Sequence, residues 1–330
     1  MSAGIQSIDA GYQSSPVVKW YEMVPFLVAL AVFFALPDYL ALGARVLIFV
    51  LFALSLDLVV GFAGIVTLGH AAFFGAGAYA AGFIGAYTPV SDPILQTFGG
   101  ALAAGVVGLA TGAIVLRTEG LARVMLTLAF AAILLELANK FSGFTGGTDG
   151  LSGITVGPLL SRFSFDLYGQ TGYLYCLGTV FVGWVIVRRL VYSPFGLTLT
   201  GIRDNAARMQ ALGAPVYGRL LAAYTISALL AGAAGALLAE TNQLVGLDVL
   251  SFEVSGEVLV MLILGGVGRI YGAFLGPAIF LVLQDILAKQ FPEFWYLGVG
   301  VVLIAVVWFA PEGIAGLLAA LSRRIRGRRA

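Results

Sequence analysis

Long apolar runs follow one another along nearly the whole chain, and they constrain its fold more than any other feature. A helix that crosses the hydrocarbon core of a bilayer needs about 20 mostly apolar residues. Of the 330 residues, 60% are hydrophobic and 11% are charged, whereas soluble domains carry about 25% charged residues. The sequence therefore predicts an all-α polytopic membrane protein without a separate soluble domain.

The apolar runs divide into about ten predicted transmembrane helices. The 44 glycines fit this fold, because small residues let transmembrane helices pack closely. The predicted spans are 23–41, 43–60, 70–88, 98–116, 121–139, 172–190, 220–239, 255–264, 271–288 and 294–310. The predicted domains are a polar N-terminal tail at 1–22, a membrane domain at 23–321 and a basic tail at 322–330. The first tail lacks the basic start and short apolar core of a cleavable signal, so we expect it to be retained.

Lysines and arginines divide unevenly between the two sides of this topology. Cytoplasmic loops of membrane proteins carry the excess of basic residues. With ten spans and both termini in the cytoplasm, 14 of the 18 basic residues are cytoplasmic, and only Arg45, Lys140, Arg162 and Lys289 are external. The inverted orientation would reverse this distribution. Both termini are therefore predicted to be cytoplasmic, with a long external loop at about 141–171 and a long cytoplasmic loop at about 191–219.

The cytoplasmic loop contains the segment "GIRDNAARMQALG", which predicts a short amphipathic helix. Thr200 or Gly201 can begin it, Gly213 can end it, and Pro215 prevents its continuation. At 1.5 Å per residue it would be about 16 Å long, too short to span a membrane. Its apolar face would consist of Ile202, Ala206, Met209 and Leu212, and its basic residues are Arg203 and Arg208. Two interpretations remain open: a basic helix that rests on lipid, or a helix that docks in the groove of a cytoplasmic partner.

Several motifs resemble the ABC importer permeases for branched-chain amino acids, in the order that this family has them. The segment at 202–213 is similar to the family's I-R-E-N-E-x-R-A-x-A-L-G, with Asp204 for the glutamate and Ala206 for an acidic residue. "GIVTLGHAAFFGAGAY" is similar to G-x-x-S-L-G-H-A-A-F-F-G-x-G-A-Y, with Thr67 for the serine. Further similar stretches are "VMLTLAFAAILLELA", "TGGTDGLSGI", "SPFGLTLTGIRDN" and "SGEVLVMLILGGVGRIYGAFLGP". The chain departs from the family at Asp57, often Asn there, and at Arg269, usually Ser or Thr.

The resemblance covers most of the chain from about Leu51 and is closer to the LivM-type permease than to its shorter LivH-type partner. It implies a multi-pass subunit of the bacterial inner membrane that moves branched-chain amino acids or related small polar solutes. The implied partners are a homologous LivH-type permease, two cytoplasmic ABC ATPases, an external substrate-binding protein and membrane lipid, with no nucleic acid. The residues implied in coupling to the ATPases are Ile202, Arg203, Asp204, Asn205, Arg208, Met209, Leu212 and Gly213.

The sequence contains no GxxxxGK[ST] phosphate-binding loop. The chain is therefore expected to be a transport subunit and not an enzyme. It is expected to need no cofactor or metal of its own, with ATP and Mg²⁺ bound by the partner ATPases. The alternative function is a self-powered secondary transporter or channel, which would need coupling groups within the membrane and no docking helix. A membrane enzyme ranks third, because the sequence lacks paired catalytic carboxylates, a metal cluster and a nucleophile with its base.

The one histidine, His70, lies in a glycine-broken apolar stretch. A metal site needs several ligands, and the single cysteine, Cys176, excludes a multi-cysteine site. We expect His70 to satisfy backbone groups freed by the break, with a place on the solute pathway as the alternative. Ionisable residues in spans mark pathways or buried pairs more often than lipid faces, and here they are Asp57, Glu136, Glu257 and Asp285. The candidates for the pathway or a helix break are Asp57, Thr67, Gly69, His70, Phe73, Phe74, Glu257, Gly265 and Gly266, the two phenylalanines being expected mainly to pack.

Overall fold

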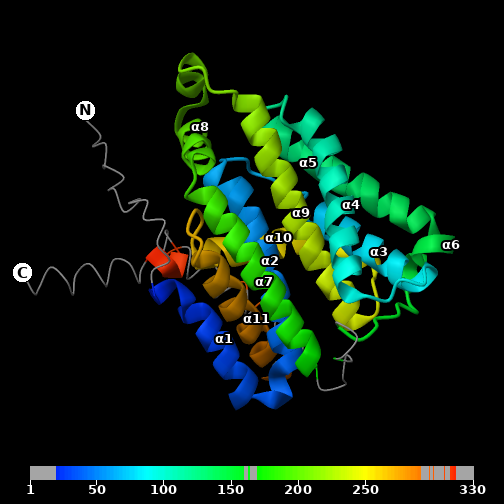
Figure 1. Ribbon diagram of the computed structural model, residues 1–330. Coiled ribbons are helices and arrows are strands. Elements are labelled where there is room, and N and C mark those ends of the chain that lie inside the picture. Colours follow the sequence, from blue (N-terminus) through cyan, green and yellow to red (C-terminus); the bar gives the residue numbers. More distant parts are fainter. Residues whose placement is uncertain are drawn as a thin grey trace, which may run out of the picture.

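A computed structural model describes residues 20–159, 163, 169–290, 297, 300, 308 and 313–316. Within these residues the named elements are all helices (Figure 1). The α-helices are α1 (Val24–Ala35), α2 (Leu40–Asp57), α3 (Ala71–Tyr87), α4 (Pro93–Val115), α5 (Gly120–Lys140), α6 (Ser142–Thr145), α7 (Gln170–Val191), α8 (Pro194–Ala211), α9 (Val216–Asn242), α10 (Phe252–Gly265) and α11 (Gly272–Gln290). The shorter helical turns are η1 (Trp20–Met23), η2 (Pro37–Tyr39), η3 (Leu58–Phe62), η4 (Gly147–Asp149) and η5 (Leu247–Leu250).

Length and composition identify the membrane-spanning elements in the described part of the chain. Six helices there are long and apolar enough to cross a bilayer: Pro37–Phe62, α4, α5, α7, α9 and α11. The apolar helices α1 and α3 are shorter, and α10 has 14 residues. The prediction of a polytopic helical membrane protein is confirmed. The count of ten spans and the side on which the termini lie remain predictions, and the tenth predicted span, 294–310, lies almost entirely outside the described residues.

Helix boundaries follow local capping chemistry, which corrects several predicted ends. The fourth span, predicted from residue 98, begins at Pro93, because the Asp92 side chain accepts a hydrogen bond from the Ile94 amide at 2.9 Å. The first span, predicted to reach residue 41, already ends at Ala35. Pro37 starts the turn that follows it, since proline restricts the residue before it and ends helices.

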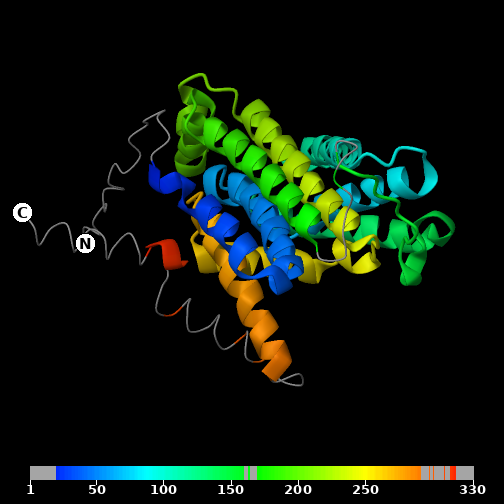
Figure 2. The same cartoon turned by 60° about the horizontal axis from the view of Figure 1, so that its bottom comes forward.

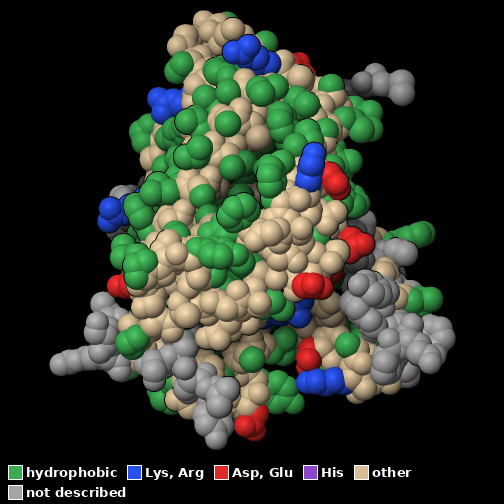
Figure 3. Space-filling model, turned by 90° about the vertical axis from the view of Figure 1, so that its right-hand side faces the viewer, with side chains coloured by type: hydrophobic (Ala, Val, Ile, Leu, Met, Phe, Trp, Pro, Cys, Tyr) green, Lys and Arg blue, Asp and Glu red, His purple; other side chains and the backbone are tan. Residues whose placement is uncertain are grey.

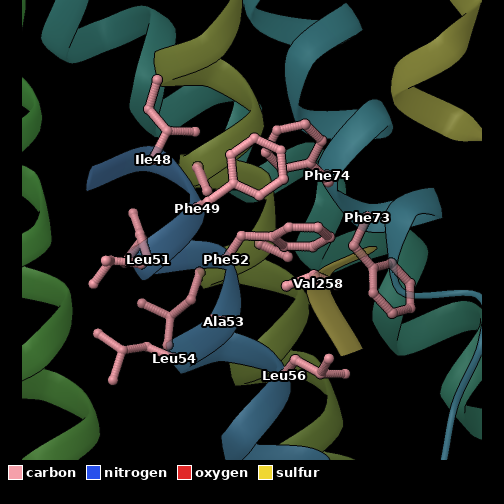
Figure 4. Close-up of a cluster of buried hydrophobic side chains, with 14 of the residues drawn as sticks. Ile48, Phe49, Leu51, Phe52, Ala53, Leu54, Leu56, Phe73, Phe74 and Val258 are labelled. Atoms are coloured by element: carbon pink, nitrogen blue, oxygen red, sulfur yellow. The ribbon is translucent and has the colours of Figure 1, made fainter. Parts of the chain in front are cut away.

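The helix α2 lies at the centre of the bundle. It contacts α7 and α9 on one side and α10 and α11 on the other, as two views show (Figures 1 and 2). Every residue from Leu47 to Val59 is buried. Phe52 lies between Phe49, Phe73 and Phe74, and its ring centroid is 4.5 Å from that of Phe74 (Figure 4). A helix buried all round by protein is able to carry polar groups that lipid would penalise.

Glycines bring α3, α4 and α9 into backbone contact. A methyl group on Gly77 of α3 would lie 2.6 Å from the carbonyl carbon of Gly232 of α9. A methyl group on Gly100 of α4 would lie 2.6 Å from the carbonyl oxygen of Gly77. These three residues form what we call the glycine junction. Close approach through small residues is the usual way in which membrane helices associate.

The predicted external loop, 141–171, is partly ordered against the bundle. It contains α6 and η4, and a bridge pairs Leu151 with Val245. The Thr155 hydroxyl donates to the carbonyl of Gly85 at 2.6 Å, so the loop is fixed to the end of α3. Figure 3 shows one face of the molecule, on which hydrophobic side chains are widespread and most acidic ones lie in the lower half, away from α8.

Candidate functional site

The site begins where the central helix α2 loses its α-helical geometry. Residues Leu58–Phe62 form one π-helical turn, and an irregular segment then leads to His70. Gly64 has a φ of 70°, which glycine adopts without the strain of a side chain. A methyl group on Gly61 would lie 2.6 Å from the amide nitrogen of Gly268, so only glycine allows this close contact.

Asp57 links the broken end of α2 to the loop between α10 and α11. Its Oδ1 accepts a hydrogen bond from the Gly268 amide at 2.7 Å, and the side chain is buried. The loop is itself turned by glycines, since Gly266 and Gly268 have φ values of 114° and 75°. A side chain at Gly265 would collide with the carbonyl of Gly272, so α10 and α11 also meet closely. The two glycine-rich stretches, far apart in the sequence, therefore form one junction.

Arg203 of α8 joins this junction from the predicted cytoplasmic loop. Its Nη1 donates to the carbonyl oxygen of Gly61, and its aliphatic stem packs over Gly64. Its Nε also lies 3.4 Å from Oδ1 of Asp204, an exposed pair that contributes little stability. We call Asp57, Gly61, Arg203 and Gly268 the α2–α8 junction. It connects α8, α2 and the α10–α11 loop through two long-range hydrogen bonds.

The helix α8 differs from the predicted amphipathic helix in its start and its continuity. It begins at Pro194, since Ser193 caps it by accepting from the Phe195 amide at 3.2 Å. It is interrupted at Asn205, whose φ and ψ of −160° and 96° are not helical. The Asn205 side chain accepts from the Arg208 amide at 2.8 Å and so starts a second short helical segment. Gly213, with a φ of 83°, follows the end of that segment.

The interruption at Asn205 removes the single apolar face that the 3.6-residue period predicted. Ile202 is buried within this chain, and Met209 packs against Gly201. Leu212 is 74% exposed, and Arg208 is also exposed. The exposed surface of α8 therefore includes Arg208 and the adjoining Leu212, whereas Ile202 belongs to the core of the protein.

His70 lies at the meeting point of α2, α3 and α9. Its Nε2 is 2.9 Å from the Ser55 hydroxyl and 3.5 Å from the Ser227 hydroxyl. Ser55 donates to the carbonyl of Phe52, and Ser227 donates to the carbonyl of Ser55, so both hydroxyl oxygens are left as acceptors. The Nε2 atom therefore carries the proton and donates. The ring also stacks on Phe52 with an interplanar angle of 12°.

The residues next to His70 fix the irregular segment to other helices. The Gly69 amide donates to the Thr67 hydroxyl at 3.2 Å, and the Ala71 amide donates to the Ser255 hydroxyl of α10 at 2.9 Å. A side chain on Gly69 would collide with the backbone of Thr127 in α5. Phe73 and Phe74 are buried among aromatic rings, Phe73 against Tyr224 at 5.3 Å between centroids. These residues pack and cap in the structure, as the sequence analysis expected of the two phenylalanines.

The other ionisable candidates lie away from the α2–α8 junction. Glu257 is in α10 and lines a cavity at the end of the bundle opposite α8. Asp285 pairs with Lys289 at 2.7 Å, and Glu136 is exposed on α5. Within the described residues, no group of three or more histidine, cysteine, aspartate or glutamate side chains is arranged to hold a metal ion.

The sequence did not predict two buried charged features, an ion pair and a single carboxylate. Arg188 of α7 pairs with Glu22 of η1 through an Nε–Oε2 distance of 2.6 Å, with both side chains buried. Glu240, near the end of α9, is 1% exposed and was not among the candidates. Its signal in the sequence is a carboxylate that directly follows the apolar run "AGAAGALLA".

Comparisons with known proteins agree on one family. Residues 39–307 match the family described as "Branched-chain amino acid transport system / permease component". The chain is 28% identical over 290 residues to the high-affinity branched-chain amino acid transport system permease protein LivM of Escherichia coli (strain K12), covering 81% of this chain and 68% of that protein. It is 28% identical over 295 residues to LivM of Salmonella typhimurium, covering 83% and 69% of the two chains. It is also 30% identical over 235 residues to the L-arabinose ABC transporter permease protein AraH of Azospirillum brasilense, covering 67% and 65%. No solved structure matches the chain.

Proposed function

Because this chain belongs to the family of branched-chain amino acid permease components and is an ABC permease of the LivM type, we propose that it imports branched-chain amino acids. It is a multi-pass protein of the inner membrane with a role in transport. The proposed solute is a branched-chain amino acid because the family description and two of the relatives name that class. AraH is named for L-arabinose, so the family as a whole is not confined to one solute.

The observation that carries the proposal is the α2–α8 junction. In an ABC importer, the force from ATP hydrolysis has to reach the membrane helices through a cytoplasmic element of the permease. Arg203 provides such a connection, since it lies on α8 and donates to the backbone of Gly61 in the broken end of α2. Asp57, four residues earlier, holds the α10–α11 loop. A displacement of α8 would therefore move two membrane elements together.

The partners follow from the same proposal. ATP and Mg²⁺ are bound by two cytoplasmic ATPase subunits, a homologous LivH-type permease completes the membrane part, and an external binding protein delivers the solute. The docking surface toward the ATPase contains Arg208 and Leu212 before the turn at Gly213, whereas Met209 packs against Gly201 within the chain. Arg208 and Leu212 are exposed and available to a partner. A helix end with one apolar and one basic side chain suits a groove with an acidic rim.

His70 has a structural role in this proposal. Its ring is buried and stacked on Phe52, and its Nε2 donates to hydroxyls of α2 and α9. These hydrogen bonds fix the start of α3 beside the break in α2. An amide side chain at position 70 is able to replace them in part. Thr67 and Gly69 assist by satisfying the backbone of the irregular segment.

A reconstitution experiment distinguishes this function from a self-powered secondary transporter or channel. The complete importer is reconstituted in proteoliposomes with its binding protein, and uptake of radiolabelled L-leucine is measured. We expect uptake with ATP and none with an imposed proton or sodium gradient alone. Uptake driven by a gradient in the absence of the ATPase subunits would refute the proposal.

The predicted orientation of the chain in the membrane is tested on the same complex by labelling engineered cysteines from outside. A cysteine at the exposed position Thr148 should react with a membrane-impermeant maleimide, and one at the exposed position Ala207 should not. Labelling at position 207 from outside would contradict the predicted orientation.

A further inference from the structure

A cavity of about 1040 Å³ lies at the end of the bundle opposite α8. Its walls come from the first turns of α2, the last turns of α9 and the segment from η5 into α10. The volume is just above the usual range for small-molecule sites, about 300–1,000 Å³. The cavity therefore has room for a small solute together with water.

The charged side chains that line the cavity are of both signs, with acidic ones in excess. They are Arg45, Glu240, Asp248, Glu253 and Glu257. Arg45 is exposed, with its guanidinium carbon 5.9 Å from the centroid of the Phe49 ring, and it interacts electrostatically with Glu257. A cavity with this balance attracts an ammonium group, offers one cation to a carboxylate and disfavours a solute with net negative charge.

Glu240 points to a ligand because only one of its two oxygens is satisfied. Oε1 accepts a hydrogen bond from the Thr97 hydroxyl at 2.8 Å, and Thr97 lies 2.7 Å from the Tyr175 hydroxyl. Oε2 is buried without a hydrogen-bond partner within the described residues. Native proteins rarely leave a buried carboxylate oxygen unpaired, because the free energy lost on removing it from water is then not offset by a hydrogen bond. Glu240 is one of the residues that line the cavity, so its carboxylate is a candidate partner for a donor bound there.

The remaining wall is partly apolar, through Ile48, Phe49, Phe74, Val249 and Val254. We propose that the cavity binds a zwitterionic α-amino acid with an apolar side chain. The ammonium group lies at Oε2 of Glu240, the carboxylate at Arg45, and the side chain against the aliphatic and aromatic wall. This inference rests on the proposed function and adds the groups through which the permease itself selects its solute.

Protection of an engineered cysteine tests the site directly. In the complete importer without ATP, held in lipid nanodiscs, Thr241→Cys places a thiol in the cavity wall, and Cys176→Ala removes the buried native thiol. The rate of modification by a small maleimide is measured against increasing L-leucine. Two analogues are compared with it: 4-methylpentanoate, which lacks the ammonium group, and 3-methylbutylamine, which lacks the carboxylate. We expect L-leucine to slow modification at a concentration at least about tenfold lower than either analogue, since each analogue leaves one charge unpaired.

Two variants test which side chain pairs with the ammonium group of the solute and which pairs with its carboxylate. Glu240→Gln keeps the shape of the side chain and should remove the advantage of L-leucine over 4-methylpentanoate. Arg45→Gln should remove its advantage over 3-methylbutylamine, and since Arg45 is exposed this variant is expected to fold even if the first does not. The matched control is Asp38→Asn, an exposed carboxylate between α1 and α2 that does not line the cavity.

The outcomes separate this inference from the proposed function. Protection by L-leucine that neither variant changes, or ATP-driven uptake without any protection, would overturn the cavity site while the importer function stands. Protection with the expected charge dependence but no ATP-driven uptake of L-leucine would overturn the proposed function and support the site.

Discussion

Replacing Gly77 by alanine should disrupt the glycine junction between α3, α4 and α9. The new methyl group would lie 2.6 Å from the carbonyl carbon of Gly232, with the oxygen and Cα of that residue still nearer. Carbon atoms in contact prefer about 3.5–4.0 Å. The two helices would therefore have to separate by at least about 0.9 Å, and because both sides of the contact are backbone, no side-chain rotation relieves it.

The expected loss of stability is about 2 kcal/mol. Overpacking costs typically about 1–3 kcal/mol, and a rigid backbone contact belongs at the upper end of this range. About 0.5–1 kcal/mol of this loss is offset, because alanine loses less conformational freedom than glycine when a helix forms. The matched control is Gly178→Ala in α7, where nothing lies within 4 Å of the added methyl group. That variant should be neutral or more stable by about 0.5–1 kcal/mol.

The assay is the thermal midpoint of the purified importer in detergent, followed by size-exclusion chromatography after heating. Because the unfolding entropy grows with chain length, a loss of about 2 kcal/mol in a chain of 330 residues should lower the midpoint for Gly77→Ala by about 3 °C. The midpoint for Gly178→Ala should stay level or rise. Equal midpoints for the two variants would refute the argument that backbone contact at the glycine junction holds the three helices together.

Three further changes test other parts of the structure. Arg188→Gln should destabilise the permease by about 3–5 kcal/mol, because it leaves the buried carboxylate of Glu22 unpaired; the double variant with Glu22→Gln should recover part of the loss in the same thermal assay, and an unchanged midpoint in Arg188→Gln would contradict the prediction. His70→Gln should keep substantial transport while His70→Leu lowers the amount of folded complex, and an assembled His70→Gln complex without transport would overturn the structural role. Leu212→Asp, at an exposed position, should leave the permease folded but reduce co-purification of the ATPase; undiminished co-purification would exclude Leu212 from the docking surface.

The membrane helices were largely predictable because an apolar run of sufficient length is a local feature of the sequence. Each of the first nine predicted spans coincides with a helix of the structure, with ends shifted by a few positions, and six of these helices are long and apolar enough to cross a bilayer. The start of α4 was missed by five residues although its signals, Asp92 as a cap and Pro93 after it, are present in the sequence. The break within α8 was not predicted, because the side chain of Asn205 competes with the helical backbone for the Arg208 amide and the apolar period continues across it.

The contacts between distant segments were not predictable from one sequence. The glycine-rich stretches around Gly61 and Gly268 were both singled out, but nothing local indicates that Asp57 joins them. Arg203 was expected to face an ATPase, and its hydrogen bond to Gly61 spans 142 residues. Glu240 was missed because its value as a ligand group depends on Thr97, which lies on another helix.

The proposed connection between α8 and the membrane helices is tested most directly by the effect of Arg203→Gln on the coupling of ATP hydrolysis to transport. The variant loses a charged donor to the Gly61 carbonyl, and hydrogen bonds to charged groups contribute about 1.5–3 kcal/mol, so L-leucine uptake should fall by about tenfold or more. Uptake and ATP hydrolysis are measured together in proteoliposomes, and the control is Arg117→Gln, an exposed position just after the end of α4. We expect an assembled Arg203→Gln complex that still hydrolyses ATP but transports poorly, and a control that behaves as the unchanged protein. Uptake by Arg203→Gln at the unchanged level would contradict the claim that α8 drives the membrane helices through this residue.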